Sequence, residues 1–404
     1  MRGRRRFLGM LGGLAAGAAT ARSHAEKPDG KSFSLFLCGD VMTGRAIDQI
    51  LPHPSKPRLY EPSIKDAREY LALAKTTSGK IPRPAPLAYI WGDTLPELAE
   101  RQPAARIINL ETSVTRSDTP WPDKGIHYRM HPGNVGCLTA ADIDCCVLAN
   151  NHVLDWGREG LAETLAALRH AHIATTGAGA NLDAAQTPAI LTLDNETRLL
   201  IFAAATNDAG VPVEWTATAT RSGVHRLPDL SNHTVDRIAA LVRRHRKPGD
   251  RVLFSIHWGG NWGYAIAPDK RRFAHGLIDA AGVDLVHGHS SHHPRAIEFH
   301  KDRAILYGCG DFINDYEGIP GHEDYRGELG LMYFPTLDAT TGRLRDFDLV
   351  PTRLHRFRVE RARGDDRNWL FERLRREYRP FGTDVASEPN GAFKVLRDGM
   401  SSSR

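Results

Sequence analysis

The stretch FSLFLCGDVM, residues 33–42, decides the fold of this chain. Residues 33–38 are mostly apolar and aromatic, which is typical of a buried β-strand. Gly39 and Asp40 follow at the point where that strand ends. In α/β proteins, ligands bind at the carboxyl ends of sheet strands. The stretch therefore predicts a central strand that delivers an acidic side chain to a ligand site.

The same alternation continues along the chain. Residues 158–171 repeat leucine at helical spacing, and residues 271–281 end before Gly282, a residue type that commonly ends helices. Hairpins are predicted at 189–205 and 296–307, where two short apolar runs flank a polar turn. Early strand–helix alternation followed by hairpins predicts an α/β fold of two mixed sheets packed face to face, with helices outside. Further strands are expected at residues 106–110, 144–149, 172–176, 251–256, 284–287, 329–334 and 347–354, and further helices around 95–100 and at 235–245.

The chain has 404 residues, of which 41% are hydrophobic and 25% charged, with a formal net charge of +5. This length is enough for a large buried core in one domain or two. The cysteines form no CxxC pair and lie mostly in apolar runs, so we interpret them as core residues rather than a disulfide framework. The arginines of residues 353–379 have few interleaved aromatic residues, and we predict no nucleic-acid partner.

Residues 1–25 have the pattern of an export signal. RRRFL at residues 4–8 precedes a run of small apolar residues at 10–21. Paired arginines before Phe-Leu are typical of a twin-arginine signal, and we expect cleavage after Ala25. The alternative interpretation is a disordered, arginine-rich start. No other run approaches the ~18 apolar residues of a membrane-spanning helix, so the mature chain is predicted to be periplasmic or otherwise extracytoplasmic, at most peripheral to a membrane.

Two regions are expected after the signal. Residues 32–360 are predicted to form the main domain. Within it, residues 52–86 are rich in proline and weakly periodic, which predicts an inserted surface loop of a length that is often functional. Residues 361–404 are polar and predict one helix at 369–378, followed from residue 380 mostly by a surface tail.

Side chains of the kinds that bind metal ions follow six of the predicted strands. All offer oxygen or nitrogen and none a thiolate, a donor set that suits manganese, iron, zinc or magnesium. Because the carboxyl ends of neighbouring strands meet at one edge of a sheet, these side chains are expected to converge. They are Asp40, Asn109 and Glu111, Asn150 with Asn151 and His152, His257, the histidines His287, His289, His292 and His293, and Asp311.

Each of these residues also has an ordinary structural interpretation. Asp40 is placed to cap a helix at 46–51, Asn151 to form a turn, and His257 to lie in the core. The set is more specific than any member of it, because every member follows a predicted strand.

Six short motifs resemble the CapA family of poly-γ-glutamate capsule synthesis proteins. They are GDVM at 39–42, NLE at 109–111, NNH at 150–152, HWG at 257–259, GHxxH at 288–292 and GDF at 310–312. That family is similar to calcineurin-like metallophosphoesterases, which implies a four-layer α/β/β/α sandwich. The resemblance also implies one or two divalent ions of manganese, iron or zinc, with His152 as the catalytic histidine. The implied metal ligands are Asp40, Glu111, Asn151, His257, His289 and His292.

The motifs depart from the metallophosphoesterase pattern at several places. Met42 stands where that pattern has a histidine, so one metal subsite lacks a ligand. Glu111 stands where an aspartate usually bridges two metals. Val153 follows the Asn-His pair where an acid is usual, although Asp155 is near. The four histidines of residues 287–293 exceed the usual pair, so the assignment among them stays open.

Two functional hypotheses follow. The first is a metal-dependent hydrolase in which activated water attacks a phosphoester or similar bond. His152 would protonate the leaving oxygen or stabilise developing charge, and we assign Arg45, Asn109 and Asp311 to substrate binding. Arg45 also has an ordinary interpretation as a solvated helix residue. The second is a non-catalytic component of a capsule assembly, which binds the anionic polymer or a membrane synthase complex and holds a structural metal. The sequence has no Gly-x-Ser-x-Gly elbow and no lysine-bearing phosphate loop, which argues against a serine hydrolase and an ATP-dependent ligase.

Overall fold

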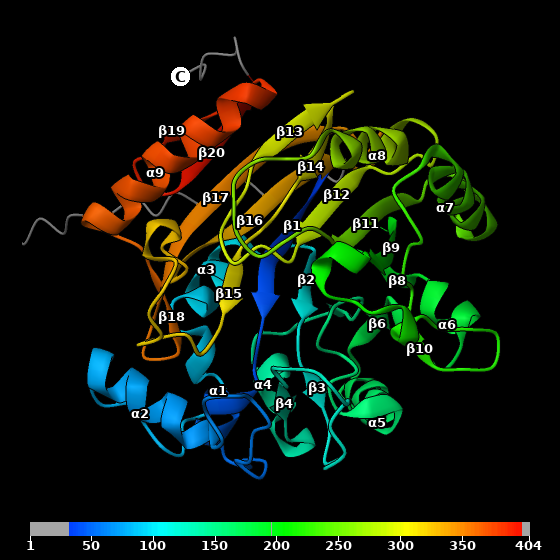
Figure 1. Cartoon of the computed structure of the whole chain (residues 1–404). Coiled ribbons are helices and arrows are strands. Elements are labelled where there is room, and N and C mark those ends of the chain that lie inside the picture. The colour runs from blue at the N-terminus through cyan, green and yellow to red at the C-terminus, as the bar shows by residue number, and fades with distance from the viewer. Residues whose placement is uncertain (1–31, 195, 398–404) are drawn as a thin grey trace, which may run out of the picture.

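The computed structural model describes residues 32–194 and 196–397. The predicted export signal, residues 1–25, lies outside the described residues. Two mixed β-sheets form the centre of the described part, and the longer helices lie on the outer sides (Figure 1). Across residues 32–194 and 196–397, no helix combines the length and apolar character that crossing a membrane requires.

The larger sheet has ten strands and carries the strand predicted at residues 33–38 near its middle. Its parallel half consists of β1 (Ser32–Val41), β2 (Ala105–Leu110), β5 (Cys145–Val147) and β6 (Ala174–Thr176). Its antiparallel half consists of β16 (Leu329–Asp338), β17 (Leu344–His355), β20 (Phe393–Arg397) and β19 (Thr383–Ser387). Two further strands join it: β15 (Asp311–Ile313) pairs with β1, and β18 (Arg358–Arg361) pairs with β17.

The smaller sheet has six strands, and parallel strands form its centre. These are β9 (Arg198–Ala205), β11 (Arg251–His257), β12 (Leu285–His289) and β14 (Arg303–Leu306). Each edge is an antiparallel hairpin strand, β8 (Ala189–Thr192) beside β9 and β13 (Ile297–His300) beside β14. Both predicted hairpins are therefore confirmed.

The two sheets pack face to face, and helices cover their outer sides. His287 of β12 lies 2.8 Å from the carbonyl oxygen of Cys38 of β1, which joins the central strands of the two sheets. The helices α7 (Asn232–His245) and α8 (Pro268–Asp279) lie against the smaller sheet, and α9 (Gly364–Tyr378) and α5 (Gly157–His170) contact the larger one (Figure 1). The predicted α/β/β/α arrangement of two mixed sheets is confirmed.

Shorter elements fill the connections. The helices are α1 (Arg45–Ile50), α2 (Ala67–Ser78), α3 (Thr94–Arg101), α4 (Gly136–Thr139) and α6 (Leu182–Gln186). Two small ladders pair β3 (Ser113–Val114) with β4 (Arg129–Met130) and β7 (Ala178–Gly179) with β10 (Gly223–Val224).

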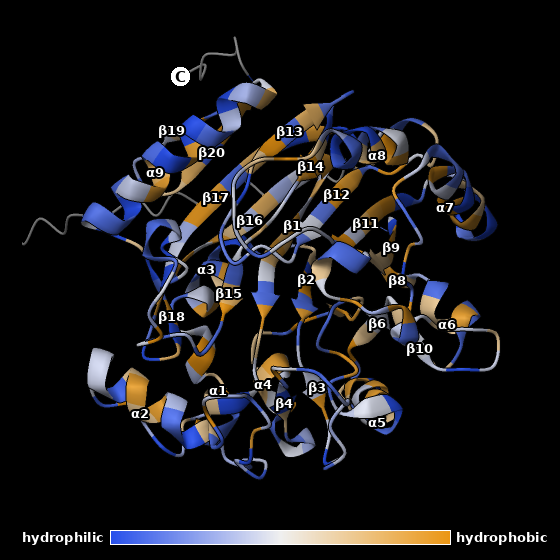
Figure 2. Cartoon of the chain, viewed as in Figure 1, coloured by the Kyte–Doolittle hydropathy of each residue, from blue (hydrophilic) through white to orange (hydrophobic). Residues whose placement is uncertain are grey.

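One apolar core fills the space between and around the sheets. The strands are rich in apolar residues, whereas α9 shows polar residues along much of its length (Figure 2). All five cysteines are buried and free, as predicted. Burial of this apolar surface is the main favourable contribution to folding.

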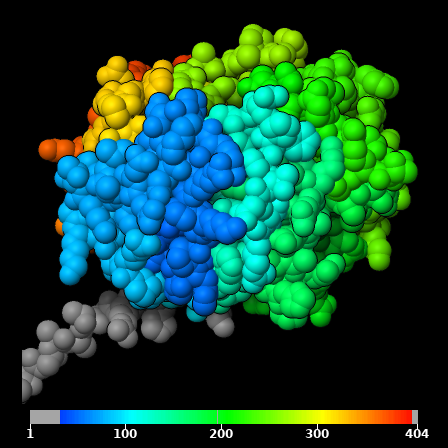
Figure 3. Space-filling model, turned by 60° about the horizontal axis from the view of Figure 1, so that its bottom comes forward, coloured from blue at the N-terminus to red at the C-terminus, as the bar shows by residue number. Residues whose placement is uncertain are grey.

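The proline-rich insertion, residues 52–86, is more ordered than a loop. It contains α2, whose residues Tyr70, Leu71 and Ala74 are buried against the body of the protein. Asp66 caps this helix by accepting a hydrogen bond from the backbone of Arg68 at 2.8 Å. The insertion forms a continuous part of one face beside residues near 110–130 (Figure 3).

The prediction of a surface tail from residue 380 was wrong for residues 383–397. These residues form the β19–β20 hairpin, and β20 extends the larger sheet by pairing with β17. Phe393 is fully buried, with its ring 5.4 Å from that of Phe371. A five-residue strand carries little pattern of its own, so its pairing depends on an open sheet edge formed far away in the sequence.

We expect Phe393→Ala to lower the free energy of unfolding by about 3–5 kcal/mol, because it removes a buried aromatic side chain and leaves a cavity. Urea-induced unfolding followed by circular dichroism measures the change. Glu372→Ala, an exposed position on α9, is the control and should change stability by less than about 0.5 kcal/mol. Equal stability of both variants would mean that the hairpin contributes nothing to the core.

Candidate metal centre

Three predicted metal ligands from three strands meet in one place. Asp40 lies near the end of β1, while His257 and His289 end β11 and β12. All three are buried, and one ligand atom from each lies within 4.8 Å of the others. The Nδ1 atoms of the two histidines are 2.8 Å apart, and Asp40 Oδ1 lies 3.8 Å from His289 Nδ1. Two nitrogens this close suit one shared ion, since metal–nitrogen bonds are about 2.0–2.1 Å long.

Neighbouring groups orient these ligands. Ser255 Oγ lies 2.9 Å from His289 Nε2, so the Nδ1 atom is the one that faces Asp40 and His257. Asp40 accepts hydrogen bonds from Asn109 Nδ2 at 2.7 Å and from the backbone N–H of Ser290 at 3.1 Å. Outer partners of this kind fix the ligand geometry of metal sites. Asp40 does not cap α1, because Gly44 stands at the N-cap position of that helix.

The protonation tendencies of these groups match a metal site. Burial lowers the pKa of His257 and of His289 well below the ordinary value, so both imidazoles are neutral, as metal ligands must be. Burial raises the pKa of Asp40, and the nearby carboxylate of Asp311 raises it further. Burial and the neighbouring Asp40 and Asp311 likewise raise the pKa of Glu111. Like charges repel one another in a low-dielectric space, so a bound cation would stabilise these acids in their charged form.

Two further predicted ligands bear oxygens that find no partner in the protein. Glu111 Oε2 and Asn151 Oδ1 are buried and accept no hydrogen bond. The other oxygen of Glu111 lies 4.0 Å from His257 Nε2 and 3.6 Å from His152 Nε2. Buried acceptors are usually paired, so these two oxygens are able to take a ligand, and Glu111 lies beside the His257 member of the group. The residues present therefore fit a divalent ion with oxygen and nitrogen ligands.

The four histidines of residues 287–293 differ in the groups that they contact. His289 belongs to the group above, and His292 lies 2.9 Å from Asp311 Oδ1. That carboxylate raises the pKa of His292, although burial alone would lower it. His287 bonds Ser255 and the Cys38 carbonyl, so both of its nitrogens are used between the sheets. His293 packs against aromatic rings, 4.4 Å from that of Tyr264 and 4.7 Å from that of Tyr325.

The predicted substrate-binding residues Asn109 and Asp311 contact the candidate metal ligands. Asn109 is fully buried, donates to Asp40 and accepts a hydrogen bond of 3.0 Å from Asn150. Asp311 is also buried and contacts His292. Gly39 brings these segments together, because a Cβ atom there would lie 1.7 Å from the carbonyl oxygen of Gly310. Both side chains are therefore placed to hold ligands in position.

His152 lies at the same rim and is held by two charged residues. Its Nδ1 atom is 2.6 Å from Asp155 Oδ2 and 3.0 Å from Lys124 Nζ, and Lys124 also pairs with Asp155. Its Nε2 atom faces Glu111. Burial lowers the pKa of His152 to about 4, against the opposing effect of Asp155. The sequence placed Asp155 only near the site, and nothing in its pattern singled out Lys124 from the loop that contains it.

Met42 occupies the position where the metallophosphoesterase pattern has a histidine. Its side chain is buried, and its sulfur accepts a hydrogen bond of 3.5 Å from the Tyr316 hydroxyl. A thioether is a poor ligand for the metals that oxygen and imidazole suit. The described residues therefore offer one well-formed three-ligand group and a weaker second position.

Arg45 is buried, and two carboxylates already bind its guanidinium. Nε lies 3.1 Å from Asp315 Oδ2, and Nη1 lies 3.0 Å from Glu61 Oε1. The rings of Tyr70 and Tyr128 flank it at 3.9 and 4.7 Å. The ion pair with Glu61 anchors the 52–86 insertion to α1 beside the metal centre.

A cavity of about 460 Å³ opens beside the candidate centre. His292 and Asn314 reach it from the metal side, and Trp262, Tyr70 and Tyr316 supply aromatic walls. Polar and charged side chains, among them Glu317 and Arg353, line the rest of the cavity, and a cavity of this size is typical of a small-molecule or chain-end binding site.

The fold and the site together define an α/β/β/α protein with a buried Asp/His/His group at the carboxyl ends of its strands. The model of the family "Bacterial capsule synthesis protein PGA_cap" matches residues 34–316, and the chain belongs to this family. It is 45% identical over 364 residues to the "Probable polyglutamine synthesis accessory protein" of Mycobacterium tuberculosis, covering 90% of this chain and 96% of that protein.

More distant relatives have related names. The "Capsule biosynthesis protein CapA" of Bacillus anthracis is 22% identical over 306 residues, covering 75% of this chain and 66% of that protein. The "PGA biosynthesis protein CapA" of Bacillus subtilis is 26% identical, covering 61% and 60%. A solved phosphatase structure from Mycoplasma pneumoniae aligns with a TM-score of 0.42 and 11% identity, covering 79% of this chain and 93% of that one.

We expect His289→Ala to lower the affinity for manganese by at least about 100-fold, because it removes a direct ligand, while Asn109→Ala lowers it by about 10–100-fold through loss of an outer partner. Equilibrium dialysis with elemental analysis measures both. His293→Ala, a change to a buried histidine outside the group, is the control and should bind manganese as the unchanged protein does. Equal binding by all variants would place any ion elsewhere.

Arg45→Met should lower the free energy of unfolding by about 3–5 kcal/mol, because it leaves Asp315 and Glu61 buried without their cation. Urea unfolding in the absence of substrate measures this, and adding Asp315→Asn to the variant should restore part of the loss. Unchanged stability with a raised KM would instead show that Arg45 binds substrate directly.

Proposed function

We propose that this protein is an exported, metal-dependent hydrolase that acts in polyglutamate capsule synthesis. The observation that carries the proposal is the convergence of Asp40, His257 and His289, with the unpaired oxygens of Glu111 and Asn151, beside His152. The relatives' names place them in capsule or polyglutamine synthesis. The export pattern of residues 1–25 is consistent with action outside the cytoplasm, near a membrane synthase complex.

The candidate metal-binding residues have different roles in this proposal. Asp40, His257 and His289 would hold one divalent ion, with Glu111, Asn151 and His292 as further ligands toward a second position. A bound ion of manganese, iron or zinc supplies Lewis acidity and makes a water molecule acidic enough to attack near neutral pH. Asn109 and Asp311 keep Asp40 and His292 in position through the hydrogen bonds described above.

His152 is the residue that moves a proton. Asp155 and Lys124 occupy its Nδ1 side, so its Nε2 atom is the one available to the reacting groups near Glu111. Because burial lowers the pKa of His152 to about 4, its imidazole is neutral near pH 7 and would first accept a proton from the attacking water, then pass it to the departing oxygen. Lys124 and Asp155 act through His152 as positioning residues.

The substrate would enter through the cavity that His292 and Asn314 reach. Its aromatic walls favour a substrate with an uncharged or partly apolar segment next to the bond that is cleaved. A phosphoester or a similar polar bond linked to such a segment fits this arrangement.

A second function is favoured by one observation, the contact between Met42 and Tyr316. The second metal position then has a thioether where an imidazole is usual and keeps only Glu111, Asn151 and His292, so the ion would serve structure. The protein would then bind an anionic polymer or a synthase partner without catalysing a reaction.

Hydrolysis of p-nitrophenyl phosphate with added manganese separates the two functions. The hydrolase proposal expects turnover that depends on the metal and is lost in Asp40→Asn. Full metal occupancy without turnover on this and on other phosphoesters would favour the non-catalytic function.

We expect His152→Ala to lower kcat by about 10²–10⁴-fold while metal content stays unchanged, because it removes the residue that transfers the proton and no direct ligand of the three-residue group. Steady-state kinetics and elemental analysis on the same preparation test this. His233→Ala, an exposed position on α7, is the matched control and should keep full activity. Unchanged turnover of His152→Ala would remove His152 from the mechanism.

A further inference from the structure

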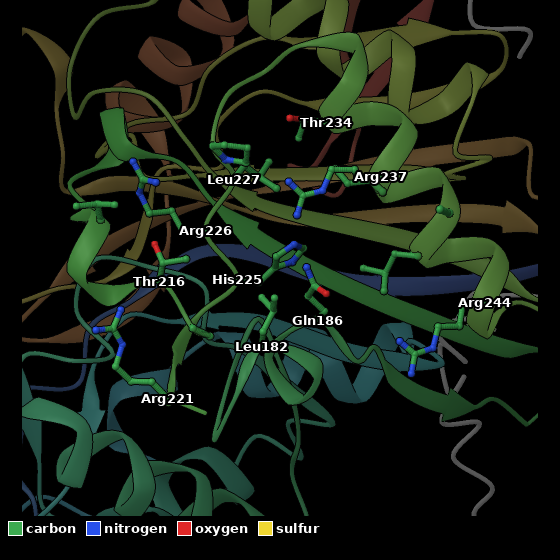
Figure 4. A pocket seen from close by; sticks show the side chains of 16 residues that line it. Leu182, Gln186, Thr216, Arg221, His225, Arg226, Leu227, Thr234, Arg237 and Arg244 are labelled. Atoms are coloured by element: carbon green, nitrogen blue, oxygen red, sulfur yellow. The ribbon is translucent and has the colours of Figure 1, made fainter. Parts of the chain in front are cut away.

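A second cavity lies apart from the candidate metal ligands. It measures about 650 Å³ and is formed by α6, α7 and the segment that follows β10 (Figure 4). None of the predicted metal ligands lines it. Its most conspicuous lining residues are four arginines from different parts of that wall: Arg221, Arg226, Arg237 and Arg244.

The positive charge of this pocket is only partly compensated within the described chain. Arg244 forms an ion pair of 3.1 Å with Asp183, but both side chains are more than half exposed. Arg226 donates to the carbonyl oxygen of Val211 at 3.1 Å, which carries no full charge. Arg221 and Arg237 form no ion pair within 4 Å across residues 32–194 and 196–397. An exposed ion pair such as Arg244–Asp183 is weak and easily exchanged.

The pocket has an apolar floor beneath these arginines. Leu227 and Ile238 are buried, and Leu182 and Leu241 line the same space. His225 lies among them, with Nδ1 2.8 Å from the Ala203 carbonyl oxygen, and burial lowers its pKa to about 4. Figure 4 shows His225 and Gln186 between Arg237 and Leu182. The ligand that fits combines several negative groups with an uncharged chain between them.

The spacing of the arginines indicates a chain rather than a single anion. Arg237 and Arg244 stand seven residues apart on α7, which is two helical turns or about 10 Å along the axis. Arg221 and Arg226 lie across the pocket on the segment that flanks β10. Guanidinium groups bind carboxylates through paired hydrogen bonds, so separated arginines match carboxylates repeated along a backbone.

We propose that this pocket binds an amide-linked chain of carboxylates, the polymer class named in the proposed function, on which this identification of the ligand rests. The side-chain carboxylates pair with Arg221, Arg237 and Arg244, and the methylene and amide segments lie on the apolar floor. The segment around Gly210 and Val211 joins this pocket to the metal centre, because Gly210 packs against Asn151 and Val211 accepts the bond from Arg226.

Isothermal titration with a poly-γ-glutamate oligomer of about ten residues tests the proposal. Loss of one charge-assisted pair weakens binding by about tenfold, so Arg237→Gln should show that change and Arg221→Gln with Arg237→Gln about 100-fold. Arg243→Gln, an exposed arginine of α7 outside the pocket, is the matched control and should bind as the unchanged protein does. Raising the salt concentration should weaken binding, since the pairs are near solvent.

The metal-site variant Asp40→Asn separates this proposal from the proposed hydrolase. Full polymer binding by Asp40→Asn, with or without measurable hydrolysis by the unchanged protein, supports a polymer site in the arginine pocket. Loss of binding in Asp40→Asn with full binding in the arginine variants would place the polymer at the metal centre and overturn the proposal. Unchanged binding by Arg237→Gln, or tighter binding of polyphosphate of equal charge than of the glutamate oligomer, would overturn it as well.

Discussion

Three carboxylates are buried together where the central strands of the two sheets end, and the organisation of the site follows from that constraint. Asp40, Glu111 and Asp311 come from segments that the parallel strands bring to one edge. An apolar interior disfavours such a cluster unless donors or cations compensate it. Asn109, the Ser290 N–H and His292 supply part of that compensation. Oε2 of Glu111 accepts no hydrogen bond from a donor among the described residues, which leaves it able to bind a cation.

The two sheets contribute unequally to this centre. The larger sheet delivers the acids and amides, whereas the smaller sheet delivers His257 and His289. The centre therefore exists only while the sheets stay in register against each other. His287, between Ser255 and the Cys38 carbonyl, holds that register from inside the core. The arginine pocket lies on the smaller sheet's side, so it and the candidate metal ligands occupy different parts of the fold.

Much of the fold followed from local pattern. The strand at residues 33–38, the helix at 158–171 and the hairpins were predicted because buried strands and amphipathic helices have distinct apolar periods. The β19–β20 hairpin was missed, because its strands are short and local sequence pattern does not show that β20 pairs with β17. The position of the candidate site was also predictable in part, because a residue that ends a strand must lie at the edge of the sheet. The direction of its side chain was not predictable in this way.

The sequence by itself determined which residues reach the edge of the sheets and that their donors are oxygen and imidazole nitrogen. It also contained the motifs by which the chain belongs to its family. The tertiary structure alone decided which of the neighbouring histidines face Asp40, because that choice depends on partners such as Ser255 and Cys38 from distant segments. It also brought Lys124 to His152 and gathered arginines into a second pocket. The physical reason is that strand ends follow from local periodicity, whereas side-chain direction and charge compensation depend on contacts made only when the two sheets pack.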